Sequence, residues 1–321
     1  MFRRQERRGG EFCDRWEIAS NEVFKIVVSL KAAPPLGSRA VSLQCQKVGW
    51  TLAFTIIVKY KPYMNSPTLI GDYGRLTTLD VPKEFSEVRN PAPRFLTDAQ
   101  IMEWNTQGYI LNAPVLSDDE LESARRCFSD PSKNVEALNI HAKYSCAQDL
   151  VRHPRTLGYL KDLIGPDIVC FISQFINKRP GSAAGNHGHQ DCVFNAMAVG
   201  CVIVWLALDD ADESNGCMQF VPGSHKFGVL ECNEHFALKD ISAYRDWVPA
   251  RVQEGHCVIM SDLLIHSSPA NPSPDRSRPA FTASYASSHT PLIEEFTSEP
   301  IHCCGVDKPA GWNLRTALRR D

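Results

Sequence analysis

The second half of the chain consists of short apolar runs separated by turn-forming residues, and this pattern limits the possible folds more than any other feature. Short strands at such close spacing pair with their neighbours through turns, as antiparallel sheets do. A few helical segments come before them, so the sequence predicts an α+β chain, mainly β, whose second half is an antiparallel sandwich or barrel. The runs, rich in Val, Ile and Phe, cover residues 167–178, 196–208, 218–221, 252–259 and 278–285.

Helix-start signals come just before these runs. Thr97 with Gln100, and Ser117 with Glu120, have the spacing of a capping box, in which each side chain bonds the backbone at the other position. The first of these helices is expected to end at Gly108, because glycine readily adopts the left-handed conformation that closes a helix. The sequence also predicts a strand over 109–115 and a helix over 155–164.

The first 63 residues differ from the rest in charge. They carry 11 basic and 5 acidic side chains, whereas the whole chain has a net charge of −3. They end in a strand-like run at 51–60, and four prolines then interrupt residues 65–95, which predicts an extended connector. We therefore expect a poorly integrated N-terminal extension and connector (1–95), a main domain (96–290) and a C-terminal tail (291–321). An initiator role for Met64 stays open.

Composition argues against several classes of protein. A net charge of −3 gives no reason to expect a nucleic-acid partner. The longest apolar run near the start covers 48–58, which is too short for a membrane span. Twelve scattered cysteines without a CxxC pair do not form the pattern of a disulfide framework, so we expect a reducing, cytoplasmic location, with organelle import left open.

The strongest chemical signal is His189-Gln190-Asp191, followed by His266 and then Arg278. On a strand, positions 189 and 191 would share a face and could bind one ion together. Two imidazoles and one carboxylate are the facial triad of non-haem Fe(II) sites, which leaves further coordination positions open. An arginine on the next strand would offer two parallel donors to a remote carboxylate.

Together with its surroundings, this set resembles a known family. The triad, the segment 215–218 leading to the turn 222–225, the segment 255–278 and the closing segment 285–287 resemble, in this order, the phytanoyl-CoA dioxygenase family of Fe(II)/2-oxoglutarate oxygenases. The resemblance covers roughly 96–287, so the main domain would be the oxygenase. It implies a double-stranded β-helix, a cupin-like jelly-roll barrel with N-terminal helices packed on one sheet and iron at one open end.

Carried over by position, the resemblance makes His189, Asp191 and His266 the catalytic iron ligands. Arg278 would hold the distal carboxylate of 2-oxoglutarate. Arg276 is the rival for this role, and the alignment of the segment 278–287 favours Arg278.

Two further assignments follow from the resemblance. Trp205 and Gln174 match family positions that line the 2-oxoglutarate pocket, although Trp205 could equally be a core residue. His225 follows a turn and is expected to be structural. Lys178-Arg179 could meet an anionic substrate, but we expect exposed loop charges without a specific role.

The resemblance therefore implies a 2-oxoglutarate-dependent non-haem iron dioxygenase that uses Fe(II), 2-oxoglutarate and O2 and releases succinate and CO2. We expect it to hydroxylate, desaturate or cyclise a C–H bond of a small organic metabolite, in specialised metabolite biosynthesis. Acyl-CoA alpha-hydroxylation stays open, although no dense basic patch suits a polyanionic ester. A homodimer also stays open.

Three other interpretations compete with this one. A halogenase on the same scaffold would lack the acid, but Asp191 is present. A cupin site using His187 with His189 would need a glutamate shortly downstream, where residues 192–195 supply none. A catalytically silent jelly-roll binding module would have a broken triad or no arginine, and this sequence keeps both.

Overall fold

The structure is a computed structural model that describes most of the chain from residue 85 onward. Side chains are described over 85–130, 138–183, 185–192, 200–233, 236–290 and 299–306, and the backbone also at 193–194 and in five strands before residue 60. The chain divides into two compact units, Met1–Leu79 and Asp80–Asp321. Most of the predicted connector and most of the predicted C-terminal tail lie outside the described residues.

The first unit contains a five-stranded antiparallel sheet. Each strand pairs with the next one along the chain, in the order β1-β2-β3-β4-β5. The predicted strand-like run at 51–60 coincides with β5, and the other four strands were not predicted. The weak integration of this segment with the main domain stays a prediction. The strands are Phe2–Arg4 (β1), Arg15–Ala19 (β2), Lys25–Lys31 (β3), Ser38–Lys47 (β4) and Trp50–Lys59 (β5).

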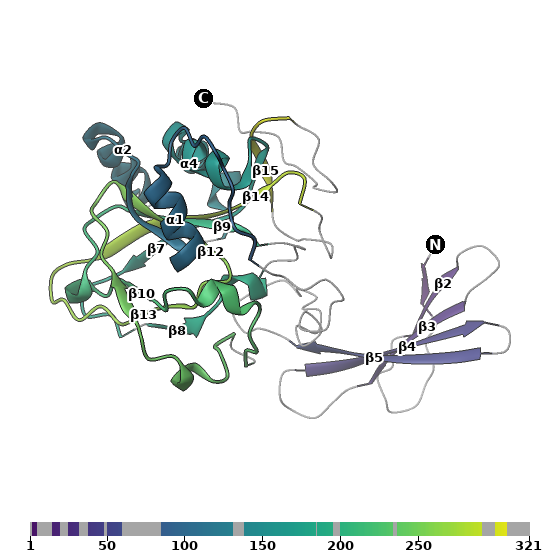
Figure 1. Cartoon of the computed structure of the whole chain (residues 1–321). Helices are drawn as coiled ribbons and strands as arrows, with labels where there is room; N and C mark the ends of the chain where they lie inside the picture. Colours follow the sequence, from purple (N-terminus) through teal and green to yellow (C-terminus); the bar gives the residue numbers. More distant parts are fainter. Residues whose placement is uncertain are drawn as a thin grey trace. The chain divides into compact units, whose positions relative to one another are not determined.

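The second unit is built on two antiparallel sheets (Figure 1). The larger sheet has the order β15-β7-β14-β9-β12-β6 and the smaller has the order β11-β10-β13-β8, so the chain passes repeatedly from one to the other. The predicted class, α+β and mainly β, is confirmed. The larger sheet contains Tyr109–Pro114 (β6), Ile168–Lys178 (β7), Val202–Ala207 (β9), His256–Ser261 (β12), Arg278–Ser287 (β14) and Ile301–Cys304 (β15); the smaller contains Asn186–His189 (β8), Met218–Phe220 (β10), Val248–Ala250 (β11) and His266–Ser268 (β13).

The described helices follow the local signals closely. Both predicted capping boxes are present, since Thr97 exchanges bonds with Gln100 and Ser117 with Glu120. Gly108 ends the first helix at φ 87°. No helix in the described part of the chain is both long and apolar enough to cross a bilayer. The helices are Asp98–Gln107 (α1), Asp118–Ser129 (α2), Ser145–Val151 (α3) and Pro154–Ile164 (α4).

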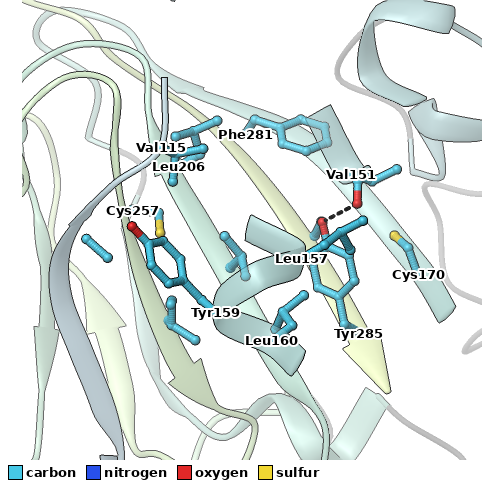
Figure 2. Packing of buried hydrophobic residues seen from close by; sticks show 14 of the residues in the cluster. Val115, Val151, Leu157, Tyr159, Leu160, Cys170, Leu206, Cys257, Phe281 and Tyr285 are labelled. Atoms are coloured by element: carbon cyan, nitrogen blue, oxygen red, sulfur yellow. Dashed lines mark hydrogen bonds between the residues drawn. The ribbon is translucent and has the colours of Figure 1, made fainter. Parts of the chain in front are cut away.

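The larger sheet is buried on both faces. Successive side chains of a strand point to opposite faces, so β9 sends Val204 into a cluster with the helices and Trp205 into a cluster with the smaller sheet. Figure 2 shows the helix side, where Leu157 of α4 lies beside Tyr285 of β14, whose hydroxyl donates to the Val151 carbonyl (3.2 Å). The predicted packing of helices on one sheet is thus found on the larger sheet.

The smaller sheet is covered on its other face by the described residues between 228 and 247. Leu238 from this segment packs with Ile265, and its N–H donates to the Gly188 carbonyl (2.9 Å). A Cβ atom added to Gly188 would lie 2.2 Å from Ile241 Cδ1. A larger residue at this position would therefore require the Ile241 side chain to move.

Several predicted boundaries need correction. The run expected at 252–259 contains a turn at Gly255 (φ 72°), so β12 begins at His256. β9 begins at Val202 rather than at Ala196, and residues 195–199 lie outside the described residues. Ile301–Cys304, placed in the C-terminal tail, pairs with β7 as an edge strand.

Cysteine pairing and α3 were also missed. The structure contains a disulfide between Cys127 of α2 and Cys146 of α3, whereas the sequence analysis expected scattered unpaired cysteines. Neither residue belongs to a recognisable motif. No side-chain cap marks the start of α3 at Tyr144, so the sequence held no signal for this helix.

Stability should depend on the helix side of the larger sheet. Phe281 of β14 stacks on Phe128 of α2 at a centroid distance of 5.6 Å, and Phe128 also stacks on Phe175 of β7 at 4.8 Å. We expect Phe281→Ala to lower the free energy of unfolding by about 3–5 kcal/mol in urea denaturation, because it leaves a cavity. Met102→Ala, on an exposed part of α1, should change it by no more than about 0.5 kcal/mol. Equal losses in both variants would contradict this packing.

Candidate metal centre

The predicted triad is assembled by strand pairing. His189 is the last residue of β8 and His266 is the first residue of β13, and the two are direct partners in the antiparallel ladder. Their ring centroids lie 4.2 Å apart. Asp191 begins a 3-10 turn directly after β8. The expectation that positions 189 and 191 share a strand face is therefore wrong, because the strand ends first, and the turn brings the carboxylate round instead.

The three side chains offer their donor atoms to a common point. Asp191 Oδ1 lies 3.4 Å from His189 Nε2 and 3.7 Å from His266 Nε2. One donor atom from each residue lies within 4.8 Å of the other two, and no other such cluster occurs among the described residues. Donors that are each about 2.1 Å from one ion and at right angles are roughly 3 Å apart. The observed spacing is thus close to that of a metal-binding triad.

Backbone carbonyls fix the orientation of both imidazoles. His189 Nδ1 lies 2.7 Å from the His187 carbonyl, and His266 Nδ1 lies 3.0 Å from the Leu264 carbonyl. A carbonyl can only accept, so each Nδ1 carries a hydrogen and each Nε2 keeps its lone pair when the ring is neutral. This is the arrangement by which proteins orient metal-binding histidines.

The two imidazoles differ in their affinity for protons. Burial and the nearby His189 together lower the pKa of His266 to about 4, against the opposite effects of Asp191 and of the hydrogen bond to the Leu264 carbonyl. Burial acts to lower the pKa of His189, but the hydrogen bond and charge of Asp191, together with the bond to the His187 carbonyl, give a net upward shift. At neutral pH the His266 imidazole is therefore unprotonated and free to bind a metal.

A buried guanidinium lies on the larger sheet. Arg278, the first residue of β14, is 2% exposed, and its Cζ lies 5.1 Å from the ring centroid of Trp205. Burial lowers its pKa to about 10, so it remains charged at neutral pH. Its Nε atom has no hydrogen-bond partner in the described structure. Such a group is ready to receive an anion.

A second buried cation lies beside it. Lys178, the last residue of β7, is the ladder partner of Arg278. Its pKa is lowered to about 8 by burial and by the charge of Arg278. Its Nζ donates to the carbonyls of Ser268 (2.8 Å) and Pro269, which follow His266. Lys178 thus connects the cationic pair of the larger sheet to the strand that carries a triad histidine. The expectation that Lys178 is an exposed loop charge is wrong.

Gln174 and Trp205, the two residues expected to line the 2-oxoglutarate pocket, lie on the same sheet face as Arg278. Gln174 and Trp205 are both ladder partners of Thr282, which lies four positions along β14 from Arg278. Directly opposed residues in a sheet share a face, as do alternate residues of one strand. Trp205 is buried and Gln174 is half-buried. Both side chains therefore belong to the interior face that carries the cations.

Arg276, the alternative carboxylate anchor, already bonds other residues of the chain. Arg276 donates to Asp212 Oδ2 (3.0 Å), to Ser214 Oγ (2.9 Å) and to the Asp210 carbonyl (3.0 Å), in a partly exposed position. An arginine so engaged has little capacity left for a carboxylate ligand. This geometry favours Arg278 over Arg276.

The remaining histidine candidates lie outside the cluster. His187 is exposed and contributes its backbone carbonyl rather than its ring. His225 is buried against Phe85, with ring centroids 4.2 Å apart, and burial lowers its pKa to about 4. Gln190 was not predicted to be a functional residue, although its side chain is fully buried and bonds three backbone groups. Its place between two ligands was the available signal.

The sequence is similar to a known protein family and to several of its relatives. Residues 104–280 match the sequence model of the Phytanoyl-CoA dioxygenase (PhyH) family. The zebrafish (Danio rerio) phytanoyl-CoA dioxygenase domain-containing protein 1 is 34% identical over 168 residues, which cover 48% of this chain and 57% of that protein. This chain thus spans little more than half the length of that relative. A methylphosphonate hydroxylase from Gimesia maris is 24% identical over 249 residues, covering 68% of this chain and 93% of that one.

Solved structures share the fold. The apo form of the non-heme monooxygenase ThoJ superposes with a TM-score of 0.57 at 22% identity, over 67% of this chain and 86% of that one. CytC3 with Fe(II) and alpha-ketoglutarate superposes with a TM-score of 0.53 at 18% identity, over 68% and 92%. The family match covers more than half of the chain and includes all three triad residues. The chain belongs to the phytanoyl-CoA dioxygenase family.

Proposed function

We propose that this protein is an Fe(II)- and 2-oxoglutarate-dependent dioxygenase whose iron ligands are His189, Asp191 and His266. The observation that carries the proposal is the convergence of one ligand atom from each of the three side chains within 4.8 Å of one another, with both Nε2 atoms next to Asp191 Oδ1. The backbone bonds at both Nδ1 atoms support it, because they hold the rings in the tautomer that a metal needs.

The donor set fits iron. Two neutral imidazoles and one carboxylate form the facial triad of non-haem Fe(II) enzymes. A silent binding module would have no reason to keep such a set with its lone pairs aimed together. With 2-oxoglutarate and O2, bound Fe(II) supplies the oxidation of a substrate C–H bond, with release of succinate and CO2. The protein's own part is to bind, to orient and to exclude water.

The cationic pair suits the second carboxylate of 2-oxoglutarate. Arg278 would receive it on its fork of parallel donors, while the face of Trp205 restricts the guanidinium plane. Lys178 adds positive charge in the same recess. No carboxylate contributes to the pKa shift of either cation, so their charge is not neutralised by the described residues. Gln174 and Trp205 would line the co-substrate site from the sheet.

The scaffold and the substrate can be proposed in more detail. We infer that the two sheets form the double-stranded β-helix of the family, with the triad at its open end. The substrate is proposed to be a small organic metabolite of specialised metabolism, oxidised in the cytoplasm. An acyl-CoA alpha-hydroxylase is the alternative. The relative named methylphosphonate hydroxylase, of which this chain covers 93%, supports a compact substrate rather than a long acyl ester.

Loss of a triad histidine should abolish iron binding. We expect His266→Ala to weaken Fe(II) binding by at least about a hundredfold, because the ion loses one of its three protein ligands. Anaerobic Fe(II) titration and 2-oxoglutarate turnover to succinate would measure both effects. His187→Ala is the matched control, since it removes a nearby ring but keeps the carbonyl that orients His189. An active, iron-binding His266→Ala protein would refute the assignment, and loss of binding in His187→Ala would favour a site of cupin type.

Replacement of the buried arginine should act on the co-substrate. We expect Arg278→Met to raise KM for 2-oxoglutarate roughly tenfold to a hundredfold, because a charge-assisted bond contributes about 1.5–3 kcal/mol. Succinate release with Fe(II) and ascorbate across a metabolite panel would give the rates and would also test the proposed activity itself. Arg276→Met should leave KM unchanged. If the two variants have the opposite effects, Arg276 is the anchor, and if wild type never turns over 2-oxoglutarate, the oxygenase proposal fails.

The same variant has a second expected effect. Arg278 is a buried cation without a carboxylate partner among the described residues, which is unfavourable in the ligand-free protein. Arg278→Met should therefore keep or raise the melting temperature without 2-oxoglutarate. A large fall in melting temperature would show that Arg278 has a structural partner.

A further inference from the structure

The residue between two of the triad ligands has no role in the proposed function. Gln190 is fully buried. Its Nε2 donates to the carbonyls of Gly228 (2.9 Å) and Leu263 (2.7 Å), and its Oε1 accepts from the N–H of Leu230 (2.9 Å). Both hydrogens of the amide and its oxygen are thus used, in a place where an unpaired polar group would be costly.

These bonds join the two segments that carry the triad. On one side, Gln190 is covalently bonded to His189 and Asp191. On the other side, Leu263 directly precedes Leu264, whose carbonyl orients the ring of His266. A backbone bond from Cys192 to the Asp262 carbonyl (2.9 Å) runs parallel to this connection.

The third segment is the cover of the smaller sheet. Gly228 and Leu230 begin the stretch that packs on the face turned away from the larger sheet. The amide therefore connects the triad both to its second half and to the layer behind it.

We propose that Gln190 is a positioning residue of the metal centre, which sets metal affinity by fixing the His189–Asp191 segment against the His266 segment. It does so without touching the ion. The inference rests on the metal site of the proposed function and extends it to a residue outside the ligand set. Partners that orient metal ligands typically change metal affinity by about 10- to 100-fold when removed.

A purely structural role makes a different prediction. If Gln190 only satisfied buried backbone groups, its loss would lower stability and leave metal affinity unchanged. The chain offers a matched control for this effect in Gln148 of α3. Gln148 is also buried, donates to the His141 carbonyl (3.1 Å) and accepts from Arg152 (3.0 Å), and it lies among the helices rather than in the triad segments.

The test compares Co(II) binding and apo-protein melting in the full-length chain. Gln190→Met removes all three bonds at similar volume, and Gln190→Glu keeps the shape but removes the amide donors. We expect both to weaken Co(II) binding by about 10- to 100-fold and to alter its visible absorption bands. Gln148→Met should lower the melting temperature about as much as the Gln190 substitutions do. It should leave the Co(II) affinity within about twofold of wild type. If Gln190→Met does not fold, the Co(II) affinity of Gln190→Glu tests the inference instead.

Two results would overturn the inference. One is wild-type Co(II) affinity in the Gln190 variants, and the other is an equal loss of affinity in Gln148→Met. A wild-type protein that binds no Co(II) would refute the metal centre and this inference with it. A wild-type protein that binds Co(II) but turns over no 2-oxoglutarate would refute the oxygenase proposal alone, and the Gln190 comparison would still stand.

Discussion

Two hydrogen bonds from imidazole Nδ1 atoms to backbone carbonyls determine what the site can do. In each case the acceptor lies two residues before the histidine, at His187 for His189 and at Leu264 for His266. The orientation of each ring is therefore coupled to its own backbone, and the pairing of β8 with β13 sets the two backbones opposite each other. The triad is thus preorganised by sheet register before any ion is present. Preorganisation of this kind is what gives a metal site its geometry.

The larger sheet contributes the opposite electrostatic element. It places Arg278 and Lys178 side by side in the interior, where burial and mutual repulsion lower the pKa of Lys178 to about 8. Burying two like charges is unfavourable, and an anion bound beside them would relieve this cost. A ligand that binds only the folded state also stabilises it. Anion binding and folding stability should therefore be coupled through these two residues.

Local rules predicted what local interactions decide. The capping boxes at Thr97 and Ser117, the left-handed glycine at position 108 and most strands of the larger sheet follow from short stretches of sequence. The three residues named for the triad come together in the fold, although Asp191 reaches the cluster from a 3-10 turn and not from a strand.

Features that depend on distant contacts were missed. Lys178 stands before Arg179-Pro180 and resembles a loop residue, and only its pairing with Arg278, 100 positions away, buries it. The bridge from Cys127 to Cys146 and the edge strand Ile301–Cys304 likewise depend on the tertiary fold. Sequence periodicity carries no information about such pairings.

The two faces of the larger sheet separate stability from chemistry. The helix side is packed with aliphatic and aromatic side chains. The other face carries the cations and faces the smaller sheet, which contains β8 and β13. The strands of the smaller sheet are only three or four residues long, so its geometry needs another source of rigidity. The buried amide of Gln190 supplies it at the point where the triad segments meet. A His-x-Asp pattern alone occurs often by chance. In this chain the middle residue carries a buried amide that connects both segments of the triad, and this distinguishes the site from a chance match.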